Sequence, residues 1–272
     1  TPLREGKALK VSEFNVKVSG DSSLCHISDI LHLKDSRILL VDKSNSKIKM
    51  FGHDYKYQEN MTLQAGPWSA CSLSKIEVAV TIPDHKTIQI IAITDKMLKA
   101  RDIRTRLKCW GIAVVKDQLV ITTFDDEHSI LIMDMTGKEI RTIRPYSYQT
   151  DKFLHPLYIK PDTTDSIIYI PYSTGDKLVA YSMNWNVLFT YMNQDMKFAA
   201  GNDTDREGNI YLCGVNSHSV QEISAEGELI KTLISKKEEG KTPLRIRFYT
   251  DKDGFILTYV SCDTIEVYEL RV

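Results

Sequence analysis

The chain has 272 residues, with 35 lysines and arginines against 36 aspartates and glutamates, so its formal net charge is −1. A hydrophobic share of 42% and a charged share of 26% are typical of a folded protein and exclude general disorder. The charge balance excludes a simple polybasic nucleic-acid binder, and the short apolar runs exclude a membrane-spanning helix.

The cysteines indicate the redox environment. There are five of them, an odd number, and no two have CxxC spacing. This pattern argues against a structural zinc site and against a dense disulfide framework. We therefore expect reduced, mostly buried thiols in a cytoplasmic protein. Because the chain begins with Thr1 rather than Met, we interpret residues 1–7 as the remnant of a linker from a longer protein.

Short runs rich in Ile, Val, Thr and Tyr, separated by Asp, Asn, Gly and Ser, predict β-strands along the whole chain. After an alternating first segment, Leu9–Val18, a polar turn followed by a short strand recurs roughly every 43 residues. The first core residues of these strands are Ile48, Ile88, Ile130, Leu178, Val220 and Ile265. Neighbouring strand signals give each repeat about four strands, which is the size of a propeller blade.

One segment, residues 92–108, also allows a helix. Its apolar residues recur at helical spacing: Ile93, Met97, Ala100, Ile103 and Leu107. The repeat register instead places Lys99–Ile103 as a strand, and we favour that interpretation.

The repeats predict an all-β, six-bladed β-propeller with four-stranded antiparallel blades, forming a single domain over residues 1–272. We place the blades at about 24–63, 67–103, 108–143, 153–191, 197–233 and 244–272. The sixth repeat stops after its third strand. We therefore expect the N-terminal strand, residues 8–18, to close blade six and so remove its free edge.

The residues Asp205–Ile223 (DREGNIYLCGVNSHSVQEI) resemble the NHL repeat, whose pattern runs roughly V-D-x-D-G-N-I-Y-V-A-D-x-x-N-H-R-I-Q-V-F. Ile38–Phe51 and Asp125–Met133 are weaker matches. The chain thus resembles the C-terminal NHL-type propeller of tripartite-motif proteins, in its divergent invertebrate (mollusc) form. The resemblance implies the substrate-recognition part of a ubiquitin ligase. RING, B-box and coiled-coil segments, and with them ligase activity and oligomerisation, would lie outside these residues.

A binding surface is predicted where the innermost strands begin. Aligning the repeats places Trp68 and Trp110 there on adjacent blades, with His155 and Arg247 close by. Because Trp and Arg dominate binding energies at interfaces, we predict that these four residues bind a protein partner or ubiquitination substrate at the channel mouth. The alternative is that both tryptophans pack between blades.

A basic stretch suggests single-stranded RNA binding as a second function. It contains six basic residues with only Asp102 among them: Lys96, Lys99, Arg101, Arg104, Arg106 and Lys108. Such a patch could bind phosphates. The alternative is a solvated edge strand on which charge prevents pairing with another chain.

An enzymatic propeller of the calcium-dependent lactonase type is the third hypothesis. It needs carboxylates and amides around a channel cation, and only Asp29, Asn202 and Asp203 are candidates. No GxSxG, HExxH or P-loop pattern is present. Three histidines near turns fall on different blades, so we do not interpret them as metal ligands: His85, His128 and His218. We predict a domain without enzymatic activity, metal or cofactor, and without membrane association.

Overall fold

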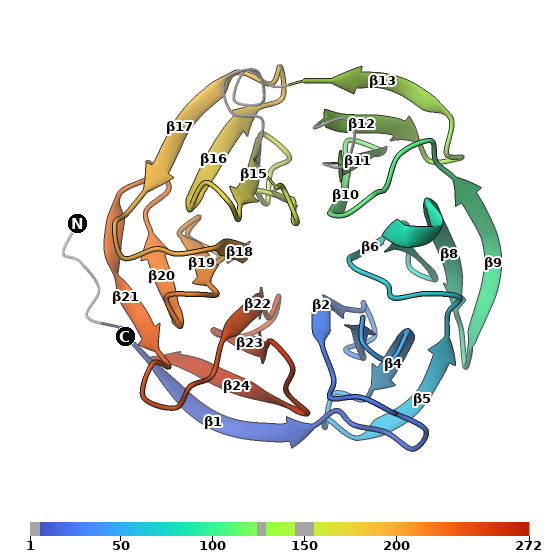
Figure 1. The fold of residues 1–272 in the computed structure, drawn as a ribbon, viewed down its shortest axis with the longest axis horizontal. Coiled ribbons are helices and arrows are strands. Elements are labelled where there is room, and N and C mark those ends of the chain that lie inside the picture. The colour runs from blue at the N-terminus through green and yellow to red at the C-terminus, as the bar shows by residue number, and fades with distance from the viewer. Residues whose placement is uncertain (1–5, 124–128, 145–154, 272) are drawn as a thin grey trace.

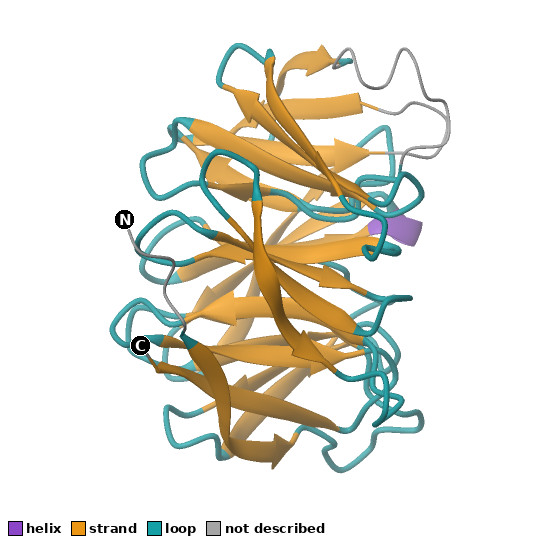
Figure 2. Cartoon of the chain, turned by 90° about the vertical axis from the view of Figure 1, so that its left-hand side faces the viewer, coloured by secondary structure: helices purple, strands orange, loops and turns teal. Residues whose placement is uncertain are grey.

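The β-branched runs of each repeat form antiparallel strands joined by tight turns, and the turns stack the repeats side by side around a ring. The computed structural model describes residues 6–123, 129–144 and 155–271. It contains six four-stranded sheets arranged as a closed propeller (Figure 1). Figure 2 shows the ring from the side, with turns and loops gathered at its two faces. The predicted all-β, six-bladed fold is confirmed.

The first three blades each contain four consecutive strands, from the channel outward. Blade one contains β2 (Ile27–His32), β3 (Ile38–Asp42), β4 (Lys47–Phe51) and β5 (Tyr57–Thr62). Blade two contains β6 (Ala70–Ser72), β7 (Glu77–Ile82), β8 (Thr87–Ile93) and β9 (Met97–Arg104). Blade three contains β10 (Ile112–Val115), β11 (Gln118–Thr123), β12 (Ser129–Asp134) and β13 (Glu139–Ile143).

Blades four and five repeat the same order, and blade six draws on both ends of the chain. Blade four contains β14 (Lys160–Pro161), β15 (Ile167–Tyr172), β16 (Lys177–Ser182) and β17 (Val187–Met192). Blade five contains β18 (Ala199–Thr204), β19 (Ile210–Gly214), β20 (Ser219–Ile223) and β21 (Leu229–Ser235). Blade six contains β22 (Pro243–Phe248), β23 (Gly254–Tyr259), β24 (Thr264–Arg271) and β1 (Lys7–Asn15).

The N-terminal strand closes blade six, as predicted. β1 pairs antiparallel with β24, from Lys7 opposite Arg271 to Asn15 opposite Thr264. The first and last strands, β1 and β24, therefore lie side by side in Figure 1. Because β1 covers the outer edge of β24, that edge cannot pair with another chain, which removes a template for aggregation.

The ambiguous segment is extended. β8 and β9 cover most of it and pair over their length, with Ile88 opposite Ile103 and Ile93 opposite Met97. The strand interpretation is confirmed and the helical alternative is wrong. Met97 packs against blade one, Ile103 packs against blade three and Ala100 is exposed, so these residues do not form one helical stripe. The one helix among the described residues is a 3₁₀ turn, η1 (Pro83–His85).

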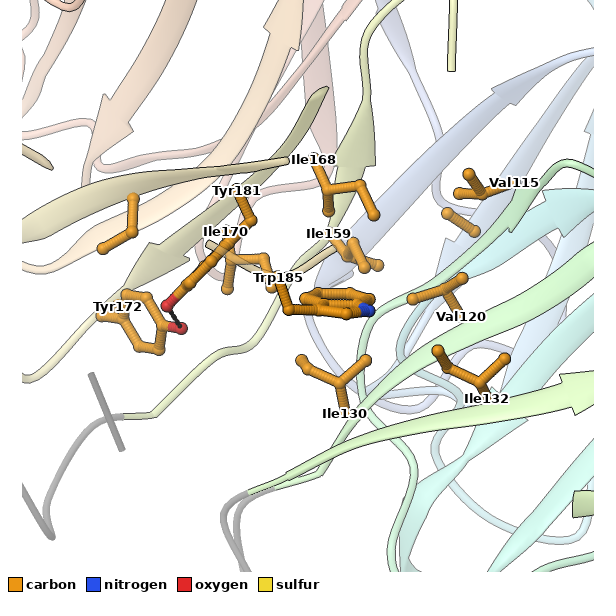
Figure 3. Packing of buried hydrophobic residues seen from close by; sticks show 12 residues of the cluster. Val115, Val120, Ile130, Ile132, Ile159, Ile168, Ile170, Tyr172, Tyr181 and Trp185 are labelled. Carbon is orange, nitrogen blue, oxygen red and sulfur yellow. Dashed lines mark hydrogen bonds between the residues drawn. The ribbon is translucent and has the colours of Figure 1, made fainter. Parts of the chain in front are cut away.

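The core lies between blades. Six apolar clusters each join two neighbouring sheets, and a seventh fills part of the channel. Figure 3 shows the cluster between blades three and four, where Ile130 and Trp185 pack together. The hydroxyls of Tyr172 and Tyr181 pair at 2.7 Å within it, so their burial leaves no unsatisfied polar group on either ring.

All five cysteines are free, and four are buried. This agrees with the thiols expected from the sequence. Within the described ranges, no helix is long and apolar enough to cross a bilayer.

Candidate functional site

The innermost strands all run in the same direction, so the channel has a start face, where these strands begin, and an end face, where they finish. Trp68 and Trp110 lie at the start face and touch edge to face, with ring centroids 5.1 Å apart. Trp68 is only 5% exposed, and its Nε1 donates a hydrogen bond to the Leu157 carbonyl at 2.8 Å. The two tryptophans are in contact, and they pack into the channel core.

The channel is closed at this level by a hydrophobic cluster. Its members come from five blades: Trp68, Trp110, Leu157, Tyr158, Ala200, Phe198 and Leu244, with Val215 and Val260 beside them. Tyr158 reaches across the ring and donates a hydrogen bond from its hydroxyl to the Ser28 carbonyl at 2.9 Å. Among the described residues, this cluster fills the channel at the start face.

The repeat alignment behind the predicted surface is wrong in blade six. Ser69 and Gly111 pair with Thr81 and Thr122 on the next strand. The residue in the same position of blade six is Arg245, which pairs with Thr258. Arg247 is two residues further along β22 and so lies nearer the end face.

The alignment is also wrong in blade four. There the channel position belongs to Tyr158, three residues after His155. The His155 carbonyl accepts a hydrogen bond from the Ser173 amide at 3.1 Å, and its own amide donates to Thr174 Oγ1 at 3.2 Å. His155 is therefore held at the border between the first two strands of blade four, away from Arg247.

Two glycines allow the innermost strands to approach closely. A Cβ on Gly111 would lie 2.8 Å from the Tyr158 carbonyl carbon, and one on Gly201 would lie 2.6 Å from the Leu244 carbonyl oxygen. Both contacts are with backbone atoms, which cannot rotate away. Glycine at these two positions lets Tyr158 and Arg245 occupy the centre of the channel.

Below the aromatic cluster, Asp29 pairs with two arginines. Asp29 Oδ1 accepts hydrogen bonds from Arg245 Nε at 2.7 Å and from Arg247 Nη2 at 3.1 Å. Arg245 also stacks on the Tyr158 ring at 4.9 Å. Burial opposes ionisation of Asp29, but the two guanidinium charges outweigh it and lower the pKa of Asp29.

A second carboxylate pairs with a lysine nearer the end face. Asp203 Oδ1 lies 2.6 Å from Lys160 Nζ, and Asp203 Oδ2 accepts a hydrogen bond from the Phe248 amide at 2.8 Å. Burial opposes ionisation, yet the charges of Lys160 and Arg247 lower the pKa of Asp203 to about 2. The carboxylates that might have held a channel cation, Asp29 and Asp203, are thus already neutralised by cationic side chains.

Two adjoining pockets on the end face are formed by described residues of the channel and of blades six and one. The seam pocket, about 600 Å³, lies between blades six and one and is lined by His32, Lys34, His53, Tyr55, Tyr249 and Lys252 among others. The channel pocket, about 320 Å³, leads to the channel floor and is lined in part by His32, Lys160, Asp203, Thr204, Arg247 and Tyr249. Of the four predicted partner-binding residues, Arg247 alone lines either pocket.

Tyr249 forms the wall shared by the two pockets. Its hydroxyl pairs with the Tyr55 hydroxyl at 2.6 Å, and its ring lies 4.8 Å from the His32 ring. Lys252 Nζ sits 4.0 Å from the centre of the same ring, within cation–π range. Burial raises the pKa of Tyr249, so the phenol stays protonated. Contacts with Tyr55, His32 and Lys252 therefore fix the position of the Tyr249 side chain.

The predicted RNA-binding stretch lies at the outer rim, mainly on β9. Arg104 Nη1 donates to Thr87 Oγ1 at 2.8 Å, while Lys96 is exposed in the preceding turn. The other four pair with carboxylates: Lys99 with Asp102 at 2.7 Å, Arg101 with Glu77 at 3.2 Å, Arg106 with Glu139 at 3.4 Å and Lys108 with Asp84 at 3.1 Å. This pairing reduces the positive potential that phosphates would need.

One cluster among the described residues has metal-like donors, namely Asp21, Cys25 and Asp42. The ammonium of Lys49 already contacts all three, at 2.6 Å, 3.3 Å and 2.7 Å respectively. The cluster is therefore an ammonium site rather than an open metal site.

Two of the three turn histidines can be placed. His218 has a positive φ of 53°, and its Nδ1 lies 3.0 Å from the Lys241 carbonyl oxygen, as suits a turn residue. His85 ends η1, and His128 lies outside the described residues.

No protein-family model matches the chain, and no curated protein matches it. Solved structures do match. A catalytically inactive histidine-to-alanine variant of virginiamycin B lyase from Staphylococcus aureus, solved with quinupristin, has a TM-score of 0.71 and 13% identity. That match covers 98% of this chain and 100% of the lyase chain.

Two further structures have the same architecture. A streptogramin B lyase has a TM-score of 0.72 and 10% identity, covering 96% of this chain and 98% of that one. A Bacteroides caccae protein of unknown function has a TM-score of 0.62 and 14% identity, covering 79% and 83%. The fold is a six-bladed β-propeller. At these identities the likeness shows the fold alone, and it gives no specific support to the NHL or tripartite-motif resemblance.

Proposed function

We propose that this propeller is a recognition domain that holds a segment of a protein partner across the seam and channel pockets of its end face. The observation that carries the proposal is that the two pockets adjoin and share His32, Tyr249 and Thr250. A closed ring presents such a surface already formed, so binding costs little ordering of the propeller.

The charge of the two pockets favours an acidic segment. Five basic side chains line them, against three carboxylates, which leaves a net charge of +2 in a protein whose total is −1. The basic residues are Lys34, Lys160, Arg206, Arg247 and Lys252, and the carboxylates are Asp203, Asp205 and Asp251. Charge complementarity of this kind steers partners and selects among them.

The NHL-like pattern of Asp205–Ile223 supports a narrower version, in which the domain recognises substrates for a tripartite-motif ubiquitin ligase. The lyases of the same fold show that such a ring can also carry enzymes. We favour recognition over catalysis because Asp29 and Asp203 are engaged with arginine and lysine side chains. RNA binding is disfavoured by the ion pairs along the rim.

The proposal is tested by selecting peptides from a random phage-displayed library on the immobilised propeller. We expect acidic peptides with apolar residues to be enriched. The double variant Lys34→Glu/Lys252→Glu reverses two exposed charges of the seam pocket. It should weaken the selected peptides by about tenfold or more in fluorescence polarisation, because two favourable charge contacts become repulsive.

The matched control is Lys96→Glu/Lys99→Glu, which reverses two exposed charges at the rim. It should leave peptide affinity unchanged if the pockets are the site. Equal weakening by both double variants, or peptides that still bind the pocket variant, would refute the proposed surface. Tight salt-dependent binding of a random RNA that only the rim variant abolishes would support the RNA function instead.

A further inference from the structure

The floor of the channel pocket carries excess positive charge. Lys160, Asp203 and Arg247 line the pocket there, and Asp29 and Arg245 are buried next to Arg247. The five side chains form two linked groups: Asp29 with Arg245 and Arg247, and Asp203 with Lys160. Arg247 also lies 3.9 Å from Asp203, so the groups form one network of three cations and two anions. Burial and the neighbouring Arg247 lower the pKa of Lys160, and together they outweigh the charge of Asp203, which raises it. An added anion would relieve this imbalance.

Polar groups on this floor also have unused hydrogen-bonding capacity. Arg247 Nη1 is too far from Asp203 for a hydrogen bond, and Lys160 Nζ reaches only Asp203 among the described residues. The Thr204 hydroxyl and His32 Nε2 are buried without a partner in the same described part of the chain. Both residues line the channel pocket, and Thr204 is only 7% exposed. Buried polar groups normally have partners, so this set is prepared for a ligand.

The pocket also has apolar wall surface beside its charged and polar residues. Leu31, Phe248 and Tyr249 form part of its wall, and the volume of about 320 Å³ suits a small organic molecule. The geometry points to a site for a monocarboxylate with an apolar or aromatic body, its carboxylate between Lys160 and Arg247 and its body against these side chains. One negative charge balances the single excess cation, whereas a phosphate dianion would overcompensate it beside Asp203.

This inference rests on the proposed function only in using the same face of the ring. It names the chemical group that the channel pocket accepts, whether on a free acid or on a partner segment. The two can fail separately, because the carboxylate site is measured with a small molecule and no partner.

The test is a titration of the intact chain with benzoate, followed by NMR chemical shifts and thermal shift, with benzamide as the neutral isostere and inorganic phosphate as the competing anion. Benzoate should bind with a Kd on the order of 1 mM, as suits a ligand of its size. Lys160→Met should weaken it about tenfold or more, since a charged hydrogen-bond partner is lost. Lys197→Met, at an exposed lysine paired with Asp176, is the matched control and should change nothing.

A second variant keeps the proposal testable if Lys160→Met fails to fold. Asp203→Asn removes a carboxylate from the floor, so benzoate should bind at least as tightly and raise the melting temperature more than in the unsubstituted chain. Benzamide binding as well as benzoate, phosphate binding more tightly, or no loss on Lys160→Met would overturn the proposal. The absence of saturable benzoate binding would overturn it too. Benzoate binding without any peptide selection would leave this site standing and refute the proposed function.

Discussion

Asn202 on β18 is a buried amide whose oxygen and nitrogen both lack a hydrogen-bond partner among the described residues. The register shows why this is unusual. Asn202 pairs with Leu212, as Ile30 pairs with Leu40 and Ile246 with Leu257. The equivalent residues of other blades are thus apolar, and the amide sits in a space shaped for hydrocarbon. An unsatisfied buried polar group costs about 1–3 kcal/mol.

We therefore expect Asn202→Leu, which is close to isosteric, to stabilise the protein by about 1–2 kcal/mol. Urea unfolding followed by circular dichroism measures the change. Asn209→Leu is the matched control, because the Asn209 amide donates to Asp205 at 3.0 Å and its loss should destabilise. Equal destabilisation by both substitutions would contradict the prediction.

At this scale the sequence located some site residues and misplaced others. It predicted Trp68 and Trp110 as neighbours, but their burial depends on Leu157 from across the ring, which no local pattern reveals. Arg245 was missed in favour of Arg247. Asp29, Ser69, Gly111 and Gly201 each lie the same number of residues before the first core residue of their blade. Tyr158 and Arg245 lie one residue further back, so counting back from those core residues would have found Arg245. The pocket residues Tyr249 and Lys160 carry no local signal.

At the scale of elements, β4 holds the connection between the closing strand and blade one. Lys49 on β4 is fully buried, and its ammonium donates to the Val16 carbonyl at 2.9 Å as well as to Asp21 and Asp42. Val16 and Asp21 belong to the segment that joins β1 to β2. One side chain therefore ties blade six's closing strand to the first blade.

Lys49→Met should destabilise the chain by about 3–5 kcal/mol, because it leaves Asp42 buried without a cation and Asp21 with Lys47 as its remaining partner. The free energy of unfolding in urea checks this value. Lys56→Met removes a lysine whose side chain is 83% exposed and pairs with the exposed Asp54, so it should change the stability by less than about 0.5 kcal/mol. A similar small effect at both positions would show that Lys49 contributes little.

The strands themselves were largely predictable, because each is short, β-branched and bounded by turn residues. Repetition also decided the one ambiguous case: β9 has helical spacing, but its place in the repeat made it a strand. The burial of Lys49 was not predictable, since a lysine on a four-stranded blade is normally on a solvated face and only the tertiary structure brings Asp21 and Asp42 to it.

For the whole molecule, the joint between the last and first blades is the place where the ring closes. His26 precedes β2 and His32 is its last residue, and burial lowers the pKa of both histidines to about 4. The ordinary value is 6.5, so below that pH the unfolded chain binds more protons than the folded one. Both imidazoles are neutral in the fold, and their contribution is lost as the pH falls from 6.5 towards 4.

We therefore expect the melting temperature to be nearly constant above pH 7 and to fall between pH 6.5 and 5, where the carboxylates remain ionised. Differential scanning calorimetry at a series of pH values tests this. The double variant His26→Gln/His32→Gln should flatten the slope, while His53→Gln, at an exposed histidine, should not. An unchanged slope in the double variant would refute the role of the buried pair.

The sequence by itself determined the architecture: recurring strand signals gave six blades, and a sixth repeat short of one strand required β1 to complete it. These conclusions follow from local periodicity, which is written in the order of residues. Only the tertiary structure decided where a ligand could enter. Six innermost strands converge on one axis, and aromatic and aliphatic side chains from five blades fill the channel at the start face. At the end face, the channel pocket is open above Lys160 and Arg247. The sequence does not reveal this, because contacts around a ring join residues that are a blade or more apart in the chain.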